Sequence, residues 1–374
     1  MNLTKSHKFI ISGGGTGGHI YPAIAIANEI KRREPKAQFL FVGAEDKMEM
    51  QKVPAAGYEI KGLWISGLSR KLSWELLKFP FKVMSSLWNS RKIIQNFKPD
   101  IVIGTGGFAS GPILYMASQK KIPTLIQEQN SYPGITNKKL AQRAASICVA
   151  YEGLNKIFKN DYVQVTGNPI RAEIFQNLPT KKEALTFFGL EEGKKTILSV
   201  GGSLGSQNKN NAWKAQIEKI KTSNIQLIWQ TGSRDFKSLN EDISLQVDNI
   251  KILEFIHEMK MAYVAADLIV SRAGAIAISE LCLVGKPVVL LPLPWAAEDH
   301  QTKNAETLVK EGAALMIKDA VANEELVPTV LKLIQDDEGL RQMGENIKKL
   351  GKPDATTNIV DEVYKILKEN KKHN

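Results

Sequence analysis

Two stretches of the chain repeat one local order: a short apolar run, a glycine-rich turn and then an apolar helix. Lys8–Ser12 leads into GGGTGGH at 13–19, and Thr196–Val200 leads into GGSLGS at 201–206. Short apolar runs bounded by turns indicate buried parallel strands, and glycine lets the backbone turn tightly and approach a ligand closely. A length of 374 residues leaves room for two domains. The duplication therefore predicts an α/β protein with two parallel-sheet domains.

A further unit of this kind lies in the second half. The apolar run Leu268–Val270 is followed by the break Ser271–Gly274, a helix over Ala275–Val284 and the strand Val288–Leu291. The start of a helix carries unpaired N–H groups and the positive end of the helix dipole, so it suits a diphosphate. Glu280 lies about 7–8 Å further along this helix. Its carboxylate is well placed for the two hydroxyls of a ribose, and the alternative is a helix residue that faces solvent.

Polar residues also follow several strands of the first half. A second glycine-rich turn, 104–112, comes after the strand 100–103, and QEQN at 127–130 follows the strand 123–126. The carboxyl ends of parallel strands meet at one edge, where ligands bind in open α/β sheets. His19 at a helix start is favoured as a neutral imidazole that can accept a proton, although it can equally cap the turn. Glu128 is a second candidate base, or a residue that fixes a neighbouring loop.

The charge of the chain indicates an anionic partner. The net charge is +11 at pH 7, and seven basic residues but one acid lie in the segment 64–98, among Trp, Phe and Leu side chains. Basic residues interleaved with exposed aromatic ones favour an anionic membrane surface. The alternative is that these aromatic residues fill the domain core. No nucleic-acid motif accompanies the segment, so we expect no nucleic-acid partner.

The cysteines and the N-terminus indicate a cytoplasmic protein. Cys148 and Cys282 both lie in apolar runs, which predicts buried thiols rather than a disulfide or a metal site and fits a reducing compartment. The first residues lack the apolar length of a signal peptide, and no run reaches about 18 apolar residues. We therefore expect a peripheral protein at the cytoplasmic face of the cell membrane.

Six motifs together resemble the MurG family of N-acetylglucosaminyltransferases. They are GGGTGGH at 13–19, EQN at 128–130, GNPIR at 167–171, GGSLGS at 201–206, SRAGAIAISE at 271–280 and DHQTKNA at 299–305. Ser206 stands where the family usually has alanine, and SRAGAIAISE varies the family's apolar positions, but neither change removes a polar group. The resemblance implies a GT-B fold, in which two Rossmann-like domains face a central cleft. It also implies inverting transfer of GlcNAc from UDP-GlcNAc to the C4 hydroxyl of MurNAc in undecaprenyl-diphosphoryl-MurNAc-pentapeptide (lipid I), which gives the lipid II of peptidoglycan synthesis.

We place the domain junction at the GNPIR motif. The expected division is an acceptor-binding and membrane-associating domain over 1–167, a UDP-GlcNAc-binding domain over 168–351, and a C-terminal helix within 352–374 that packs back towards the first domain.

The resemblance also implies a role for individual residues. From the acceptor domain, Thr16, Gly17, Gly18 and Asn130 line the cleft. Arg171 and Ser203 approach the diphosphate, and Ile256 recognises uracil through its backbone. The helix N–H groups come from Ala275, Ile276, Ala277, Ile278 and Ser279, Glu280 binds the ribose, and Gln301 and Asn304 hold the GlcNAc hydroxyls.

His19 is the preferred general base, with Glu128 as the second candidate. The sequence has no Asp-x-Asp pair to hold a divalent metal, so we expect no cofactor, and Arg171 with the helix from Ala275 would meet the charge of the leaving group. Two alternatives remain open within this fold: a UDP-GlcNAc 2-epimerase and a non-catalytic nucleotide-binding protein. An NAD-dependent dehydrogenase is a third, weaker because no acidic residue clearly follows the second strand in the dinucleotide pattern.

Overall fold

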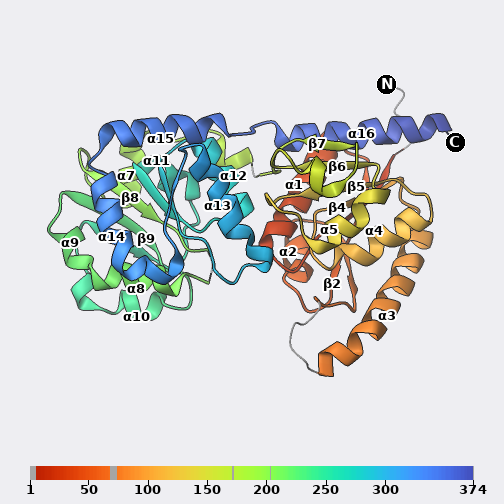
Figure 1. Cartoon of the computed structure of the whole chain (residues 1–374), viewed down its shortest axis with the longest axis horizontal. Helices are drawn as coiled ribbons and strands as arrows, with labels where there is room; N and C mark the ends of the chain where they lie inside the picture. The colour runs from red at the N-terminus through yellow and green to blue at the C-terminus, as the bar shows by residue number, and fades with distance from the viewer. Residues whose placement is uncertain (1–5, 68–73, 171, 203, 374) are drawn as a thin grey trace. The chain divides into compact units, whose positions relative to one another are not determined.

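The chain forms two compact units in a computed structural model, which describes residues 6–67, 74–170, 172–202 and 204–373. The first unit comprises residues 1–171 and 352–374, and the second comprises residues 172–351. Figure 1 labels the helices and strands of both units, and each unit is described below by itself.

The first unit is built on a parallel sheet of seven strands in the order β3-β2-β1-β4-β5-β6-β7. The strands are β1 (Lys8–Ser12), β2 (Gln38–Ala44), β3 (Ile60–Leu63), β4 (Ile101–Gly104), β5 (Thr124–Glu128), β6 (Ser146–Val149) and β7 (Val163–Val165). The helices are α1 (Gly17–Arg33), α2 (Glu49–Ala55), α3 (Trp74–Phe97), α4 (Ser110–Gln119), α5 (Ile135–Leu140), α6 (Asn155–Phe158) and α16 (Ala355–His373).

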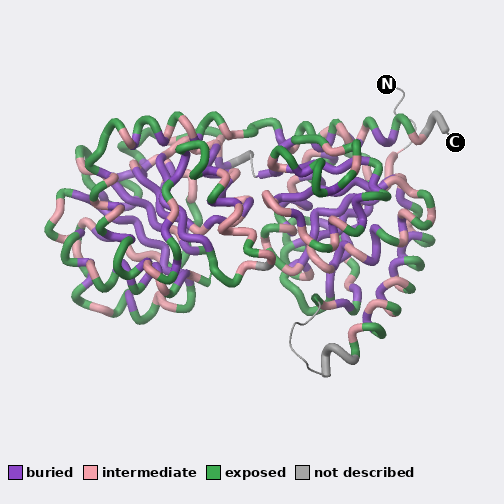
Figure 2. The backbone as a smooth tube through the Cα atoms, in the orientation of Figure 1, coloured by how far each residue is buried: buried purple, intermediate pink, exposed green. Residues whose placement is uncertain are grey.

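The central strands of this sheet are buried, as the purple segments of Figure 2 show, whereas the edge strand β7 is largely exposed. Successive side chains of a strand point to opposite faces, so Phe9 and Ile11 join one apolar cluster while Ile10 joins the other. The cluster around Phe9 includes apolar residues of both α1 and α16, such as Ile26 and Val363. The C-terminal helix therefore covers one face of the first sheet together with α1, although it follows the whole second unit in sequence.

The second unit repeats this architecture with a six-stranded parallel sheet in the order β10-β9-β8-β11-β12-β13. Its strands are β8 (Lys195–Ser199), β9 (Ile225–Gln230), β10 (Ile250–Leu253), β11 (Leu268–Ser271), β12 (Val288–Leu290) and β13 (Leu315–Met316). Its helices are α7 (Lys181–Phe187), α8 (Gln207–Ala215), α9 (Ile217–Lys221), α10 (Phe236–Asn240), α11 (Met259–Ala265), α12 (Ala275–Val284), α13 (His300–Lys310), α14 (Ala322–Leu333) and α15 (Asp337–Lys349). The prediction of two Rossmann-like parallel-sheet domains is confirmed.

Strand register brings the loops of each unit together. In the first unit Ser12 of β1 is paired with Gly104 of β4, so the two glycine-rich turns leave the sheet side by side. In the second unit Ser199 of β8 is paired with Val270 of β11, which sets the turn before α8 beside the turn before α12. These two sheet edges are where the predicted site residues lie.

One helix boundary differs from the sequence-based expectation. Because proline is favoured in the first turn of a helix, the sequence predicts a helix from about Pro22 to Arg32, but α1 begins at Gly17 and contains Pro22 in its interior. The glycines allow the helix to start directly after the turn, because Ile20 N already donates to Thr16 O at 3.2 Å. Proline deprives the carbonyl of Gly18 of its helical partner, and Gly18 is exposed, so water can take that place.

Candidate active site

The first glycine-rich turn is held from beneath by a buried carboxylate. Glu49 is fully buried, and its two oxygens accept hydrogen bonds from Gly15 N and Ala44 N, each at 3.0 Å. A Cβ on Gly14 would lie 2.1 Å from Glu49 Oε1, so the turn requires glycine at this position. The sequence analysis missed Glu49, because several acids stand nearby and nothing local marks the one that turns inwards.

His19 lies where the two glycine-rich turns of the first unit meet. Its Nδ1 is 3.1 Å from Gly14 O and 3.2 Å from Thr16 Oγ1. Gly106 and Gly107 have φ of +97° and +80° and pack against the ring, where a Cβ on Gly106 would be 3.0 Å from Cδ2. The two turns are thus in contact, as expected from the sequence.

The surroundings of His19 favour a neutral ring. Burial lowers the pKa of His19 below its ordinary value of 6.5, although nearby Glu128, the Gly14 carbonyl and Glu49 oppose this shift. A neutral ring that donates from Nδ1 to Gly14 O carries its lone pair on Nε2. The lowered pKa of His19 and the contact of its Nδ1 with Gly14 O are compatible with a ring whose Nε2 acts as a general base.

Glu128, the second candidate base, is engaged in holding a loop. Its Oε1 accepts from Asn130 N at 2.9 Å and from Asn130 Nδ2 at 3.1 Å, while its Oε2 accepts from Gly134 N at 3.1 Å and Asn137 Nδ2 at 2.8 Å. The carboxylate is 2% exposed at the end of β5. These contacts correspond to the loop-fixing alternative that the sequence left open.

Buried amides complete this edge of the first sheet. Gln127 Nε2 donates to Asn168 Oδ1 at 2.9 Å, and Asn168 Nδ2 donates to Gln129 O at 3.1 Å. Gln129 Nε2 donates to Thr105 O at 2.6 Å, which ties this network to the second glycine-rich turn. Of the predicted lining residues, Thr16 and Gly18 are exposed and Gly17 and Asn130 are half-buried. Polar contacts thus fix the turns from below while these four residues keep access to a ligand.

In the second unit, α12 spans Ala275–Val284, as predicted. Gly274 precedes it in an extended conformation with φ −67° and ψ 140°. Among the first residues of the helix, Ile276, Ala277 and Ser279 are half-buried, whereas Ala275 and Ile278 are buried and Ile278 belongs to the core. The start of α12 therefore combines the positive end of a helix dipole with partial access to a ligand.

Glu280 does not face solvent. It is 8% exposed, and its Oε2 accepts a hydrogen bond from Tyr263 OH of α11 at 3.3 Å. A carboxylate oriented by a neighbouring hydroxyl can accept further hydrogen bonds, because an ionised carboxylate has acceptor capacity for about four.

Gln301 and Asn304 connect the turn before α12 to α13. Gln301 Oε1 accepts from Ala273 N at 3.2 Å and from Leu293 N at 2.9 Å. Asn304 is fully buried, and its Nδ2 donates to Ala273 O at 3.4 Å. Arg272, a residue that the sequence analysis did not select, donates to Leu291 O at 3.0 Å and to Asp319 Oδ1 at 2.5 Å. Side chains thus cross-link the loops at this edge.

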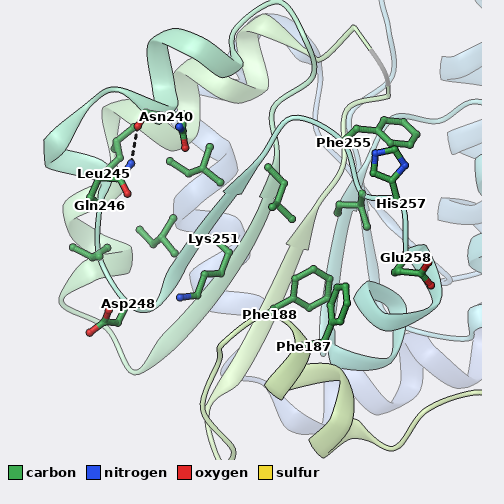
Figure 3. A pocket seen from close by; sticks show the side chains of 15 residues that line it. Phe187, Phe188, Asn240, Leu245, Gln246, Asp248, Lys251, Phe255, His257 and Glu258 are labelled. Carbon is green, nitrogen blue, oxygen red and sulfur yellow. Dashed lines mark hydrogen bonds between the residues drawn. The ribbon is translucent and has the colours of Figure 1, made fainter.

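Ile256 is buried beside a cavity of about 670 Å³ that Figure 3 shows from close by. The cavity runs along the edge strand β10, and Phe187, Phe188 and Phe255 line it together with Ile256. None of residues 275–280 lines it, so it does not coincide with the start of α12. Arg171 and Ser203, the remaining predicted donor-site residues, lie outside the described residues.

Sequence profiles of two family domains match the two units. The glycosyltransferase family 28 N-terminal domain matches residues 9–149, and the glycosyltransferase family 28 C-terminal domain matches residues 196–359.

Two relatives that match almost the whole chain share the same enzyme name. The chain is 53% identical over 365 residues to a protein of Christiangramia forsetii, with 98% of this chain and 99% of that protein covered, and 52% identical over 364 residues to one of Parabacteroides distasonis, with 97% and 99% covered. Both are named UDP-N-acetylglucosamine--N-acetylmuramyl-(pentapeptide) pyrophosphoryl-undecaprenol N-acetylglucosamine transferase.

Solved structures share the fold. Acinetobacter baumannii MurG superposes with a TM-score of 0.76 at 26% identity, covering 96% of this chain and 100% of that one. A UDP-GlcNAc 2-epimerase of Neisseria meningitidis bound to UDP-GlcNAc superposes with a TM-score of 0.65 at 17% identity, covering 96% and 100%, a likeness of fold alone. The resemblance inferred from the six motifs is confirmed, and the chain belongs to glycosyltransferase family 28, among the MurG-type N-acetylglucosaminyltransferases.

Proposed function

We propose that this protein transfers GlcNAc from UDP-GlcNAc to the C4 hydroxyl of MurNAc in undecaprenyl-diphosphoryl-MurNAc-pentapeptide, with lipid II and UDP as products. The observation that carries the proposal is the 53% identity to a protein of that name over 98% of this chain. The 2-epimerase alternative rests on fold alone, at 17% identity.

The donor site belongs to the second unit. The start of α12 at Ala275 and the positive end of the α12 dipole receive the diphosphate, together with Arg171 and Ser203. Glu280 accepts the ribose hydroxyls, Ile256 offers its backbone to uracil, and Gln301 holds the GlcNAc. Asn304 is fully buried and donates to Ala273 O, so its role is to position the turn before α12 rather than to contact the sugar. The burial of Glu280 and its bond from Tyr263 OH support this role, because both fix the carboxylate before the ligand arrives.

The acceptor is activated by the first unit. Nε2 of His19 takes the proton of the C4 hydroxyl as that oxygen attacks the anomeric carbon, and the bond to UDP breaks on the opposite side with its electron pair leaving on UDP. Configuration at the anomeric carbon is inverted by this single displacement. Glu128 supports His19 by fixing the loop at 130–137 and by placing negative charge near the ring. Thr16, Gly17, Gly18 and Asn130 line the acceptor side.

The lipid-linked acceptor requires access to an anionic membrane, and α3 offers a surface for it. Phe81, Met84 and Trp88 lie on one face of α3 and are 67%, 70% and 61% exposed. The opposite face contributes Ile93 and Ile94 to the core, so these three apolar side chains do not fill it. We call Phe81, Met84 and Trp88 the α3 surface.

Basic side chains accompany the α3 surface. Lys92 Nζ lies 5.4 Å from the ring centre of Trp88, and both Lys92 and the preceding Arg91 are exposed. Apolar side chains among cations suit the interface of an anionic bilayer. Within the described residues, no helix has the length and apolar character to cross a membrane, and Arg70 and Lys71 of the same segment lie outside them. The α3 surface and its basic neighbours support our proposal that the protein acts peripherally at the cytoplasmic membrane face.

The direct test is incubation with labelled UDP-GlcNAc and a short-chain lipid I analogue. We expect a labelled lipid-linked disaccharide and free UDP, formed only when the acceptor is present. Conversion of UDP-GlcNAc to its 2-epimer without acceptor would replace this proposal with the epimerase alternative, and UDP-GlcNAc binding without either product would replace it with a non-catalytic one.

A further inference from the structure

A buried lysine lies beneath the glycine-rich turn of the second unit. Lys209 is 0% exposed, and its Nζ has no hydrogen-bond partner among the described residues. The hydroxyl of Ser206, 2% exposed, also lacks a partner within this part of the chain. Buried polar groups are almost always paired, so two unpaired ones in one turn call for an explanation.

The geometry brings both groups to the turn between β8 and α8. Lys209 is the third residue of α8, and a long helical side chain points back towards the helix start. Lys209 Nζ would lie 3.2 Å, and Ser206 Cβ 3.3 Å, from a Cβ on Gly201. The amine is therefore enclosed by the turn, at the end of α8 whose backbone N–H groups are unpaired.

The surrounding charges leave the amine without a counter-ion. Burial and the charge of Arg272 hold the pKa of Lys209 well below its ordinary range. Arg272 itself is paired with Asp319, to which Asn208 of α8 also donates at 2.6 Å. The positive end of the α8 dipole opposes a cation as well. In the unliganded turn the amine is thus favoured in its neutral form.

We propose that Lys209 is a positioning residue that takes up one proton from solvent when the diphosphate of a nucleotide binds over the β8–α8 turn, and releases it when the nucleotide leaves. The inference rests on the proposed function and adds a residue to its donor site. The diphosphate supplies the negative charge that the amine lacks, and the Ser206 hydroxyl can accept from the ammonium while donating towards a phosphate oxygen. The turn would then bind charged diphosphate more tightly than an uncharged nucleoside.

Calorimetric titration of the full chain with UDP tests the proposal, in buffers that differ in their enthalpy of ionisation. At about pH 8 the phosphates of UDP are already ionised, so proton uptake reports on the protein. We expect a net uptake approaching one proton per UDP and none with uridine. In Lys209→Met the uptake should disappear and the Kd for UDP should rise about tenfold or more.

Lys214→Met is the matched control, because Lys214 lies on the same helix but is exposed and paired with Asp242. It should retain both the uptake and the affinity. If Lys209→Met fails to fold, the wild-type comparison of UDP with uridine decides alone. The proposal is overturned if wild-type protein binds UDP without taking up a proton, or if Lys209→Met keeps the uptake. Failure of the proposed function looks different: the protein would not bind UDP, or would bind it without transferring GlcNAc.

Discussion

The two glycine-rich turns that follow β1 and β8 share one local design, but an acidic side chain lies beneath the first and a basic one beneath the second. Beneath the first lies the Glu49 carboxylate, which accepts from two backbone N–H groups. Beneath the second lies the Lys209 amine, which has no partner among the described residues. A carboxylate that accepts from the backbone N–H groups makes the first turn unsuited to an anion, while we infer that a buried amine able to take up a proton makes the second turn receptive to one. The side chain under a glycine-rich turn thus decides which chemistry the turn serves.

The largest effect should come from the first turn. His19→Ala should lower kcat by roughly 10²–10⁴-fold, because it removes the proposed base, and leave the Kd for UDP unchanged. Calorimetry with UDP and initial rates with the lipid I analogue measure the two quantities. Full turnover in this variant would remove His19 as the base.

The pH dependence of kcat in the wild-type enzyme also tests whether His19 is the base. Since burial lowers the pKa of His19 below 6.5, the neutral base persists below that pH, and kcat should fall only as the pH drops through the lowered value. An acid limb at or above 6.5 would contradict this expectation.

Glu49 should prove structural. Glu49→Ala leaves Gly15 N and Ala44 N buried without an acceptor, so the free energy of unfolding should drop by about 2–3 kcal/mol. Denaturant unfolding measures this change, and Glu45→Ala is a neighbouring control on an exposed acid. If the first turn bound the nucleotide diphosphate, removal of this carboxylate would tighten UDP binding, and the contrast between the turns would break.

On the donor side, Glu280→Gln should raise the Kd for UDP by about tenfold, because an amide accepts less strongly from the ribose hydroxyls. Titration with UDP and with 2′,3′-dideoxy-UDP distinguishes loss of the ribose contact from a wider disruption of the donor site. The variant and the wild type should bind the dideoxy compound with the same affinity, because it lacks the ribose hydroxyls. An undiminished affinity of Glu280→Gln for UDP would remove the ribose assignment.

The smallest effect concerns the α3 surface. Trp88→Ser combined with Phe81→Ser should reduce sedimentation with anionic vesicles several-fold, while the rate on a soluble short-chain acceptor stays the same. The exposed pair Phe187→Ser and Phe255→Ser, from the second unit, is the matched control. If both double variants lose vesicle binding to the same extent, the α3 surface does not bind the membrane specifically.

Much of the fold could be predicted because its signals are local. The strand Lys8–Ser12 and the helix Ala275–Val284 have the bounds that apolar periodicity and turn residues indicated. The start of α1 was misplaced because proline is favoured in a first turn, yet the glycines before it allowed the helix to begin earlier. Cys148 and Cys282 are buried free thiols, as their apolar neighbours predicted.

The candidate site could be predicted from local sequence patterns only in part. The sequence predicts His19 and Glu128 as two possible bases, and which of them is the base stays a prediction. The structure adds only their contacts: His19 Nδ1 lies near Gly14 O, whereas the Glu128 carboxylate accepts from the loop that follows β5. Glu49 and the pair of Arg272 with Asp319 were missed, because their partners are remote in sequence.

By itself, the sequence determined two glycine-turn α/β units and the family to which they belong, since both depend on short runs of residues and on motifs in a fixed order. The tertiary structure alone decided what stands beneath each turn. Strand register joins turns that are far apart in the chain, and burial removes water from Glu49 and Lys209, so that a carboxylate must be paired and an amine favours losing its charge. Desolvation is a property of the folded surroundings, which no local pattern of residues encodes.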